Sequence, residues 1–168
     1  EDVDLRELPA GRFHEMDVGP YLTMVDVMKG DEGFYDVSFV KHLILDARTM
    51  TVSLHHTIRK HMLSILEANE AGNLPTRIIL VLGHHPAFYL GAGALKEFGN
   101  NAYATIGSFL QEPLRLTPSE TWGDAFLVPA DAEIVIEGEV IPHKREIQNP
   151  FGEYSGYYQP QCLIPVMK

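Results

Sequence analysis

Residues 21–45 read YLTMVDVMKGDEGFYDVSFVKHLIL, and this stretch decides the fold of the chain. Its two halves, 21–28 and 34–45, are rich in Val, Ile, Leu and aromatic residues, which is typical of β-strands. The segment between them, 29–33, holds two glycines, which tolerate the backbone angles of a tight turn. The pattern predicts a β-hairpin. Residues 1–20 mix acids with Pro and Gly without any period, so we expect an irregular lead-in there.

Beyond the hairpin, residues 50–54 are expected to add a third strand beside it, as in an antiparallel meander. The period then changes, because apolar residues recur at i, i+4, i+7 and i+8 from residue 58 onward. This spacing indicates a helix of about four turns that begins near Thr57 and ends at Gly72. The run RIILVLG at 77–83 is continuously apolar and suits a central strand buried on both faces.

Two Ala- and Gly-rich pieces follow, 87–97 and 102–110, and both resemble helices. Strand character returns at 126–128 and 133–140, and the tail from Pro142 is predicted to be loop-like. This order has no regular alternation of strand and helix, which disfavours a doubly wound parallel sheet. We therefore predict an α+β fold with a mainly antiparallel sheet or barrel and flanking helices.

The chain has 168 residues, enough for one compact domain with its own core. It carries 13 Lys and Arg against 23 Asp and Glu, and the net charge of −10 argues against nucleic acid as a partner. The longest apolar stretch, 78–83, is too short to span a bilayer. A lone cysteine, Cys162, and no charged-then-apolar leader predict a reducing, cytoplasmic setting. Because the chain begins at Glu1 rather than Met, we expect an excised part of a longer protein.

The most distinctive segment is PFGEYSGYY at residues 150–158, in which one carboxylate, Glu153, stands among three tyrosines. Tyrosine rings that screen Glu153 from water would favour its protonated form at neutral pH, which suits a general acid or base. The alternative is an aromatic-rich surface turn in which Glu153 is solvated.

Histidines gather at the expected junction between the third strand and the first helix. His55 and His56 are adjacent, and His61 follows His56 at i+5, which puts the two on different faces of a helix. The sequence has no H-E-x-x-H and no CxxC motif. The spacing alone therefore gives only weak support to a zinc site.

Four segments together resemble the UbiD family of reversible decarboxylases. PFGEYSGYY resembles the acid-bearing loop of that family, in which Pro-Phe-Gly-Glu is followed by a Gly-Tyr pair. VPADAEIVIEGEV at 128–140 is similar to the strand that precedes this loop, at the usual separation. ILVLGHHPA at 79–87 and DVGPYLT at 17–23 are similar to two further elements, so the resemblance covers essentially the whole chain.

The resemblance implies a single flavin-binding domain over residues 21–168, a split β-barrel of flavin-reductase-like type. Family members bind prenylated FMN through a divalent metal, manganese or magnesium, and a potassium ion, and they remove carbon dioxide from aromatic or α,β-unsaturated carboxylic acids. The family's flanking α/β and C-terminal domains, which supply the dimer contacts, are not in this sequence. We expect a small carboxylic acid as ligand and homo- or hetero-oligomers formed through those missing domains.

The resemblance also assigns catalytic positions, because a Glu-Arg-Glu trio surrounds the reacting carbon in the family. The second glutamate matches Glu153, the expected proton donor. The first falls at Gln148 and the arginine at Lys41. Lys41 keeps the positive charge but lacks the planar, two-pronged guanidinium that orients a carboxylate.

The cofactor-binding positions implied by the resemblance are Asp36, Ser38, His55 and His56, of which Asp36 and His56 are the expected metal ligands. Asp36 stands where the family has asparagine, and its carboxylate is at least as hard a donor. The family's third metal ligand, a glutamate, aligns with Ala102, whose methyl group coordinates nothing.

Three functions remain open at this point. A UbiD-like decarboxylase, or a carboxylase in reverse, would use Lys41 and Glu153 with prenylated FMN. A catalytically degenerate relative would keep the barrel for flavin binding, assembly or regulation of a partner. A plain flavin reductase of split-barrel type does not explain the segment 150–158.

Overall fold

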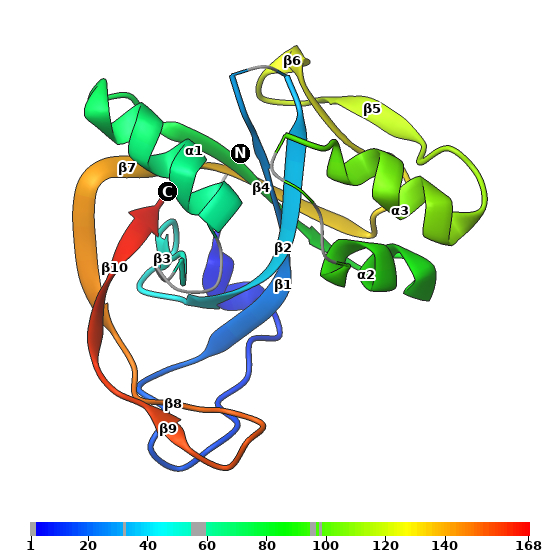
Figure 1. The fold of residues 1–168 in the computed structure, drawn as a ribbon. Coiled ribbons are helices and arrows are strands. Elements are labelled where there is room, and N and C mark those ends of the chain that lie inside the picture. The colour runs from blue at the N-terminus through cyan, green and yellow to red at the C-terminus, as the bar shows by residue number, and fades with distance from the viewer. Residues whose placement is uncertain (1–2, 32, 55–59, 95–96, 98) are drawn as a thin grey trace.

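The structure is a computed structural model that describes residues 3–31, 33–54, 60–94, 97 and 99–168. Its elements run in the order shown in Figure 1. They are η1 (Leu5–Glu7), β1 (Tyr21–Lys29), β2 (Tyr35–Leu43), β3 (Met50–Thr51), α1 (Lys60–Ala71), β4 (Thr76–Leu82), α2 (Pro86–Gly93), α3 (Ala102–Leu110), β5 (Leu116–Ser119), β6 (Gly123–Pro129), β7 (Ile134–Gln148), β8 (Phe151–Gly152), β9 (Tyr158–Gln159) and β10 (Cys162–Met167).

The predicted hairpin is confirmed as β1 and β2. The two strands pair antiparallel without a break in register, from Tyr21 opposite Leu43 to Lys29 opposite Tyr35. In the turn, Gly33 has a φ of 82°, a backbone conformation that glycine adopts without steric cost. Because the register is continuous, residues two apart on β2 share a face and residues an odd number apart lie on opposite faces.

Six strands form one sheet in the order β2-β1-β4-β7-β10-β3. β3 pairs with β10 on one side, and on the other side Met50 bridges to Ile44, just after β2. The backbone N–H of Ser53 also donates to the carbonyl of Lys41 at 3.1 Å. The sheet thus curls round and closes between β2 and β3, as a split barrel of the predicted α+β class.

Both faces of the sheet are buried, as predicted for the run 77–83. On β4, Ile78 and Leu80 face one apolar cluster while Ile79 and Val81 face another, and none of the four is accessible to solvent. α1 covers the first cluster, whereas α2, α3 and the β5–β6 hairpin cover the second (Figure 1). β4 pairs with both β1 and β7 and is central to the sheet.

The helices begin and end close to the predicted positions. In the described part of the predicted first helix, α1 ends at Ala71, one residue before Gly72. α2 is shorter than expected and ends at Gly93. α3 matches the expectation: Asn101 caps its N-terminus and Gln111, with a φ of 61°, ends it.

One expectation about the strands was incomplete and another was wrong. The segment 50–54 does lie antiparallel beside the end of β2, through the bridge between Met50 and Ile44, but the regular ladder of β3 is with β10, from the other end of the chain. The tail from Pro142 is not loop-like, since β7 continues to Gln148 and pairs there with β10. Charged residues at 144–146 and prolines at 142 and 165 hide the apolar alternation of these paired strands.

The lead-in is irregular apart from η1. Its Leu5 is buried in the first apolar cluster, and Gly11 bridges to Tyr21 at the start of β1. Among the described residues, no helix is both long and apolar enough to cross a membrane.

Barrel closure depends on Thr51, which leads to a stability prediction. Its hydroxyl accepts a hydrogen bond from the backbone N–H of Leu43 at 2.9 Å and donates to Oε1 of Gln148, and all three residues are buried. Thr51→Val keeps the shape but leaves two buried polar groups unpaired, so we expect a loss of about 2–4 kcal/mol in unfolding free energy by urea denaturation. Thr117→Val, at an exposed position on β5, is the control and should change stability by less than about 0.5 kcal/mol. Equal stability of the two variants would contradict this role of Thr51.

Candidate functional site

Lys41 and Glu153 meet although 112 residues separate them in the chain. Lys41 lies on β2, and Glu153 lies in the turn between β8 and β9. Oε1 of Glu153 accepts from both Nζ of Lys41 and Nε2 of Gln159. The two charged side chains are 20 % and 18 % exposed, so the ion pair is largely screened from water but still reachable.

The ring of Phe151 packs against the ammonium group of Lys41. Nζ of Lys41 lies 4.6 Å from the centroid of the Phe151 ring, which favours a cation over the ring face. Phe151 in turn packs edge-on against Tyr21, with 4.7 Å between the ring centroids, and both belong to a small buried cluster with Leu43. The ammonium therefore has an anion on one side and an aromatic face on another.

The tyrosines of the 150–158 segment do not screen Glu153, which corrects the sequence-based expectation. Tyr154 is fully exposed and Tyr157 is 77 % exposed. The hydroxyl of Tyr158 accepts from the backbone N–H of Met16 in the lead-in. Screening of Glu153 comes instead from Lys41 and Gln159, neither of which an aromatic-rich pattern could have indicated.

Asp17 holds the turn that carries Glu153. Its buried carboxylate accepts from the backbone N–H groups of Gly152 at 2.8 Å, His14 at 3.0 Å and Phe13 at 3.1 Å. Burial on its own raises the pKa of Asp17, but these three hydrogen bonds and the nearby His14 outweigh it and hold the pKa below its usual value. A Cβ on Gly152 would lie 2.4 Å from the His14 ring, so this approach requires glycine.

Gln148 is the last residue of β7 and lies at the closure of the barrel. It is fully buried, and in the described part of the chain its amide hydrogen-bonds to Thr51, Ser53 and Asn149. Oε1 accepts from the Thr51 hydroxyl, while Nε2 donates to Oγ of Ser53 at 3.1 Å. The amide thus links β7 to β3. Its assignment to a catalytic trio stays a prediction.

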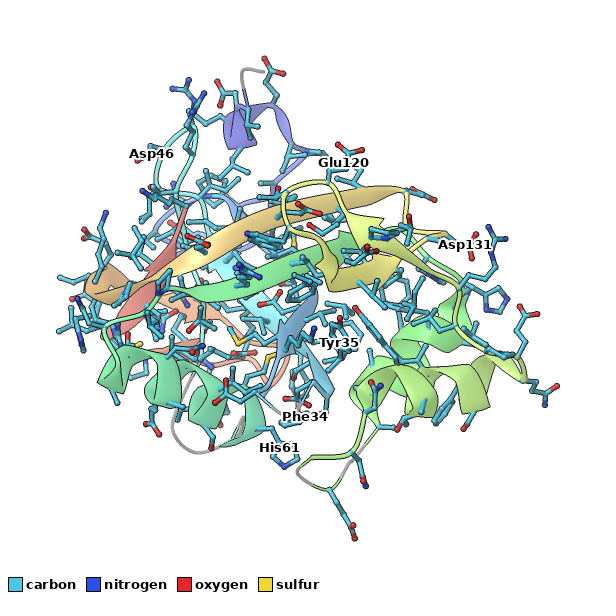
Figure 2. The ribbon with its side chains drawn as sticks, turned by 90° about the horizontal axis from the view of Figure 1, so that it is seen from above. Phe34, Tyr35, Asp46, His61, Glu120 and Asp131 are labelled. Atoms are coloured by element: carbon cyan, nitrogen blue, oxygen red, sulfur yellow. The ribbon has the colours of Figure 1, made fainter. Side chains whose placement is uncertain are left out.

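The expected cofactor-binding residues lie on the other face of β2. Asp36 and Ser38 are two apart and share that face, whereas Lys41 is an odd number of residues from both. Asp36 is buried, and its Oδ1 lies 3.8 Å from Nδ1 of His61 in the first turn of α1. Figure 2 shows His61 at that end of α1. His55 and His56 lie outside the described residues.

The described residues do not reproduce the three-ligand metal site that the resemblance implies. Ala102 is buried at the first position of α3 and offers no donor atom. No group of three or more His, Cys, Asp or Glu side chains suited to a metal occurs within the described ranges. One carboxylate and one imidazole, from Asp36 and His61, are nevertheless held side by side.

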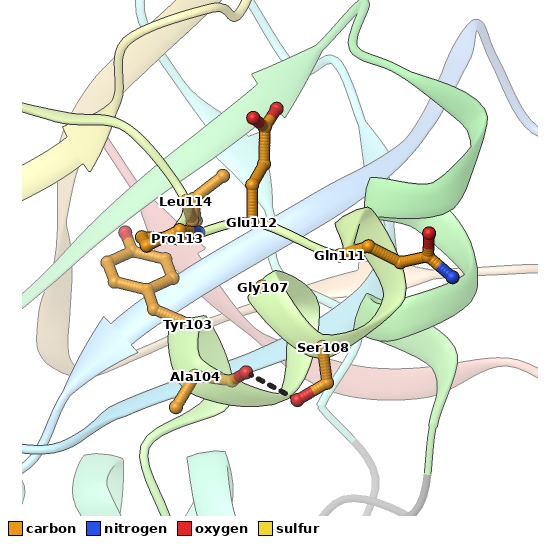
Figure 3. Close-up of a pocket in the computed structure, with 8 residues that line it drawn as sticks. All are labelled: Tyr103, Ala104, Gly107, Ser108, Gln111, Glu112, Pro113 and Leu114. Carbon is orange, nitrogen blue, oxygen red and sulfur yellow. Dashed lines mark hydrogen bonds between the residues drawn. The ribbon is translucent and has the colours of Figure 1, made fainter.

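A surface pocket of about 490 Å³ lies elsewhere, along α3 and the turn that follows it (Figure 3). Two of its polar groups are hydrogen-bonded within the protein: the Tyr103 hydroxyl donates to the carbonyl of Leu127 at 2.9 Å, and the Ser108 hydroxyl donates to that of Ala104 at 3.2 Å. Burial raises the pKa of Tyr103 well above its usual value. None of the predicted site residues lines this pocket.

The strand order and the closure between β2 and β3 define an α+β split barrel. The family model described as "UbiD: 3-octaprenyl-4-hydroxybenzoate carboxy-lyase Rift-related domain" matches residues 1–168. The chain therefore belongs to the UbiD family, which confirms the resemblance read from the sequence.

Relatives and solved structures agree with this assignment. The chain is 31 % identical over 180 residues to a phenolic acid decarboxylase of Sedimentibacter hydroxybenzoicus, covering 99 % of this chain and 36 % of the relative. It is 32 % identical over 163 residues to a pyrrole-2-carboxylic acid decarboxylase of Pseudomonas aeruginosa, covering 95 % of this chain and 32 % of the relative. The chain thus spans about a third of the length of these relatives.

Among solved structures, an evolved dimeric form of the UbiD-class enzyme HmfF from Pelotomaculum thermopropionicum, in complex with prFMN, superimposes with a TM-score of 0.92 at 33 % identity. The superposition covers all of this chain and 39 % of that one. The Sedimentibacter hydroxybenzoicus vanillic acid decarboxylase in closed form gives a TM-score of 0.90 at 27 % identity, over all of this chain and 36 % of that one.

The role of Asp17 yields a pH-dependent prediction. Since its pKa is lowered in the folded state, its stabilising effect is present above the unfolded pKa of about 4 and is lost as the pH falls through the folded pKa. Asp17→Asn should cost about 1–3 kcal/mol at pH 7, and the difference from wild type should shrink below about pH 4. Urea denaturation across this pH range measures it. Asp124→Asn, at an exposed position on β6, should show no such difference. A cost for Asp17→Asn that is constant with pH would refute the assignment.

Proposed function

We propose that this chain is the flavin-binding part of a UbiD-type decarboxylase that acts on an aromatic or α,β-unsaturated carboxylic acid with prenylated FMN. The observation that carries the proposal is the contact between Lys41 and Glu153, a cation and an acid held together in a half-screened position. The relatives named as decarboxylases of phenolic and pyrrole-2-carboxylic acids support the substrate class. The neighbour in complex with prFMN supports the cofactor.

The ion pair suits a carboxylate substrate. Lys41 offers an ammonium that can pair with an incoming carboxylate in place of Glu153. The Phe151 ring beneath Nζ of Lys41 keeps the ammonium in place during this exchange. Substrate binding thus converts an internal pair into one between the protein and its ligand.

Glu153 relays to the substrate carbon a proton that comes from solvent. Prenylated FMN, when bound, supplies an electron sink for the electron pair left by carbon dioxide. Glu153 passes its proton from the carboxyl oxygen to the carbon that has lost carbon dioxide, and the resulting carboxylate pairs again with Lys41. Gln159, which donates to Oε1 of Glu153, keeps this oxygen aimed at the site.

A flavin that contacts both Asp36 and Lys41 would have to lie across one edge of β2. Asp36 and Lys41 lie on opposite faces and are separated by about 16 Å along an extended strand. β2 is the outermost strand at one end of the sheet. In the described chain, β3 approaches its outer edge only from Lys41 onward, so no described strand pairs with that edge at residues 35–40. Asp36 would hold the phosphate end of a flavin mononucleotide at this edge, and Lys41 and Glu153 would contact its ring, which would supply the electron sink.

One observation favours a second function, that of a catalytically degenerate subunit. Ala102 removes one expected metal ligand, and Gln148 is committed to contacts with β3. Such a subunit would bind no flavin, or bind it without turnover, and would serve assembly or regulation. Flavin absorbance, metal content and decarboxylation by the full polypeptide after reconstitution separate the two functions. Potassium binding, oligomers formed through other domains and a cytoplasmic location stay predictions.

Glu153→Gln tests the proton donor directly. The amide keeps the shape and the contact with Gln159 but has no acidic proton, so decarboxylation by the reconstituted full polypeptide should fall by roughly 10²–10⁴-fold. Flavin absorbance should be unchanged. Glu146→Gln, at an exposed position on β7, is the matched control and should keep full activity. Activity of Glu153→Gln within a few-fold of wild type would rule out this role.

Substitution of Lys41 tests the cation. Lys41→Arg keeps the charge and adds a two-pronged donor for a carboxylate, so kcat/KM should be equal to or above that of wild type. Lys41→Met keeps the apolar stem but loses the charge, so KM for the acid should rise at least tenfold in steady-state kinetics. An unchanged KM in Lys41→Met would show that the substrate carboxylate binds elsewhere.

A further inference from the structure

We propose that Asn149 is a positioning residue for Glu153 and that it acts through the side chain of Gln159. The inference rests on the proposed function, in which Glu153 relays the proton. Asn149 directly follows β7 and is fully buried, and its φ of 77° lies in the left-handed region that asparagine enters more readily than most residues. Because its side chain is shielded from water, the amide depends on partners within the protein.

The Gln159 amide can serve Glu153 in only one of its two orientations. An ionised carboxylate accepts hydrogen bonds and donates none, so the amide has to present its nitrogen to Oε1 of Glu153, as it does in the structure. Turned by half a rotation, the amide would place its oxygen against the carboxylate and repel it. The contact therefore depends on what holds the other end of the amide, Oε1 of Gln159.

Asn149 holds that end. Its Nδ2 lies 3.0 Å from the carbonyl oxygen of Pro160 and 3.5 Å from Oε1 of Gln159. Since a carbonyl oxygen only accepts, the shorter contact fixes which end of the Asn149 amide is the nitrogen. The 3.5 Å contact is long for a hydrogen bond, but an N–H group at that place still favours the oxygen of Gln159 over its nitrogen. Asn149 thus secures both the side chain of Gln159 and the backbone next to it.

Two further groups behind Asn149 donate in the same direction. Nε2 of Gln148 donates to Oδ1 of Asn149 at 3.4 Å, and the hydroxyl of Thr51 donates to Oε1 of Gln148. All three residues are buried, so water does not compete for these groups. Hydrogen bonds aligned in this way polarise one another and strengthen the last bond, which ends on Glu153. The closure of the barrel therefore fixes the orientation of the Gln159 amide.

The orientation of Gln159 matters most when Lys41 leaves Glu153. Within the described chain, Oε1 of Glu153 accepts from Lys41 and from Gln159. Once Lys41 pairs with the substrate carboxylate, Gln159 is the remaining donor of the two and keeps the carboxyl in reach of the substrate carbon. Binding of the acid by Lys41 does not depend on Asn149. Removal of the Asn149 amide should therefore lower kcat and leave KM unchanged.

A double-mutant cycle tests this route of action. Steady-state kinetics are measured on the reconstituted full polypeptide with vanillate and with pyrrole-2-carboxylate, the acids named for two of the similar proteins. Glycine tolerates a φ of 77°, so Asn149→Gly removes the amide without straining the backbone. Asn149→Gly and Gln159→Met should each lower kcat about tenfold, with KM changed by less than about twofold. The variant with both changes should match Gln159→Met, because Asn149 acts through Gln159.

The matched control is Asn73→Gly. Asn73 is exposed in the turn after α1 and also has a positive φ, of 53°, so the same substitution is made in the same backbone conformation away from the site. It should leave kcat and KM unchanged. Circular dichroism and flavin absorbance check that each variant folds and binds the cofactor.

A second measurement follows Gln159 without turnover. The full polypeptide is labelled with ¹⁵N in its glutamine side chains, and the Gln159 amide is identified by NMR as the signal that Gln159→Met removes. Its protons should exchange slowly with water in the wild type and at least tenfold faster in Asn149→Gly. The wild-type spectrum alone tests the inference if Asn149→Gly does not fold, since a freely exchanging Gln159 amide would overturn it.

The two measurements together decide the inference. A loss of kcat that is not repeated in the double variant, with faster exchange at Gln159, supports it. Wild-type kcat in a folded Asn149→Gly, or losses that multiply in the double variant, overturns it. A wild type inactive on both acids counts against the proposed function, and the exchange rates then decide by themselves whether Asn149 orients Gln159.

Discussion

Closure of the sheet between β2 and β3 is the constraint on which the site depends. β3 is only two residues long, yet it pairs with β10 from the end of the chain and contacts the end of β2. This closure brings the segment that follows β7 beside β2, so that Glu153 contacts Lys41. Asp17 completes the arrangement, because it ties the lead-in to the turn at Gly152. The ion pair is therefore a consequence of barrel closure rather than of local sequence.

Position 148 carries a buried amide whose contacts hold the closure of the barrel. Gln148 accepts from Thr51 with its oxygen and donates to Ser53 with its nitrogen. A carboxylate at this buried position would have no N–H group to donate to Ser53 and would need a cation to compensate its charge. The neutral amide thus stabilises the closure at the position where the family resemblance places an acid.

Much of the fold could be predicted because its signals are local. The hairpin could be predicted from the glycines in its turn, and the central strand from the unbroken apolar run at 77–83. β7 beyond Pro142 and β10 were missed because their charged and proline residues conceal the period, and only pairing with each other stabilises them. The partner of β3 could not be predicted, since it depends on contacts between distant parts of the chain.

The candidate site was predictable only at the residues that belong to a sequence motif. Glu153 stands in a distinctive loop, and Lys41 and Asp36 follow from the same family pattern. The contacts of Gln159, Asp17 and His61 follow from no recognisable spacing, because they depend on which elements lie next to these residues in three dimensions. The expectation that tyrosines screen Glu153 was wrong for a related reason. Composition shows that aromatic residues stand near Glu153 in the sequence, but it does not show whether their rings face Glu153 or solvent.

The most direct measurement is a crystal structure of the full polypeptide with bound flavin. If the ion pair belongs to the active site, the isoalloxazine ring will lie over the edge of β2 at residues 35–40 with an atom within about 4 Å of Lys41 or Glu153. A flavin bound away from both side chains, or an edge of β2 filled by other parts of the protein, would contradict the central claim.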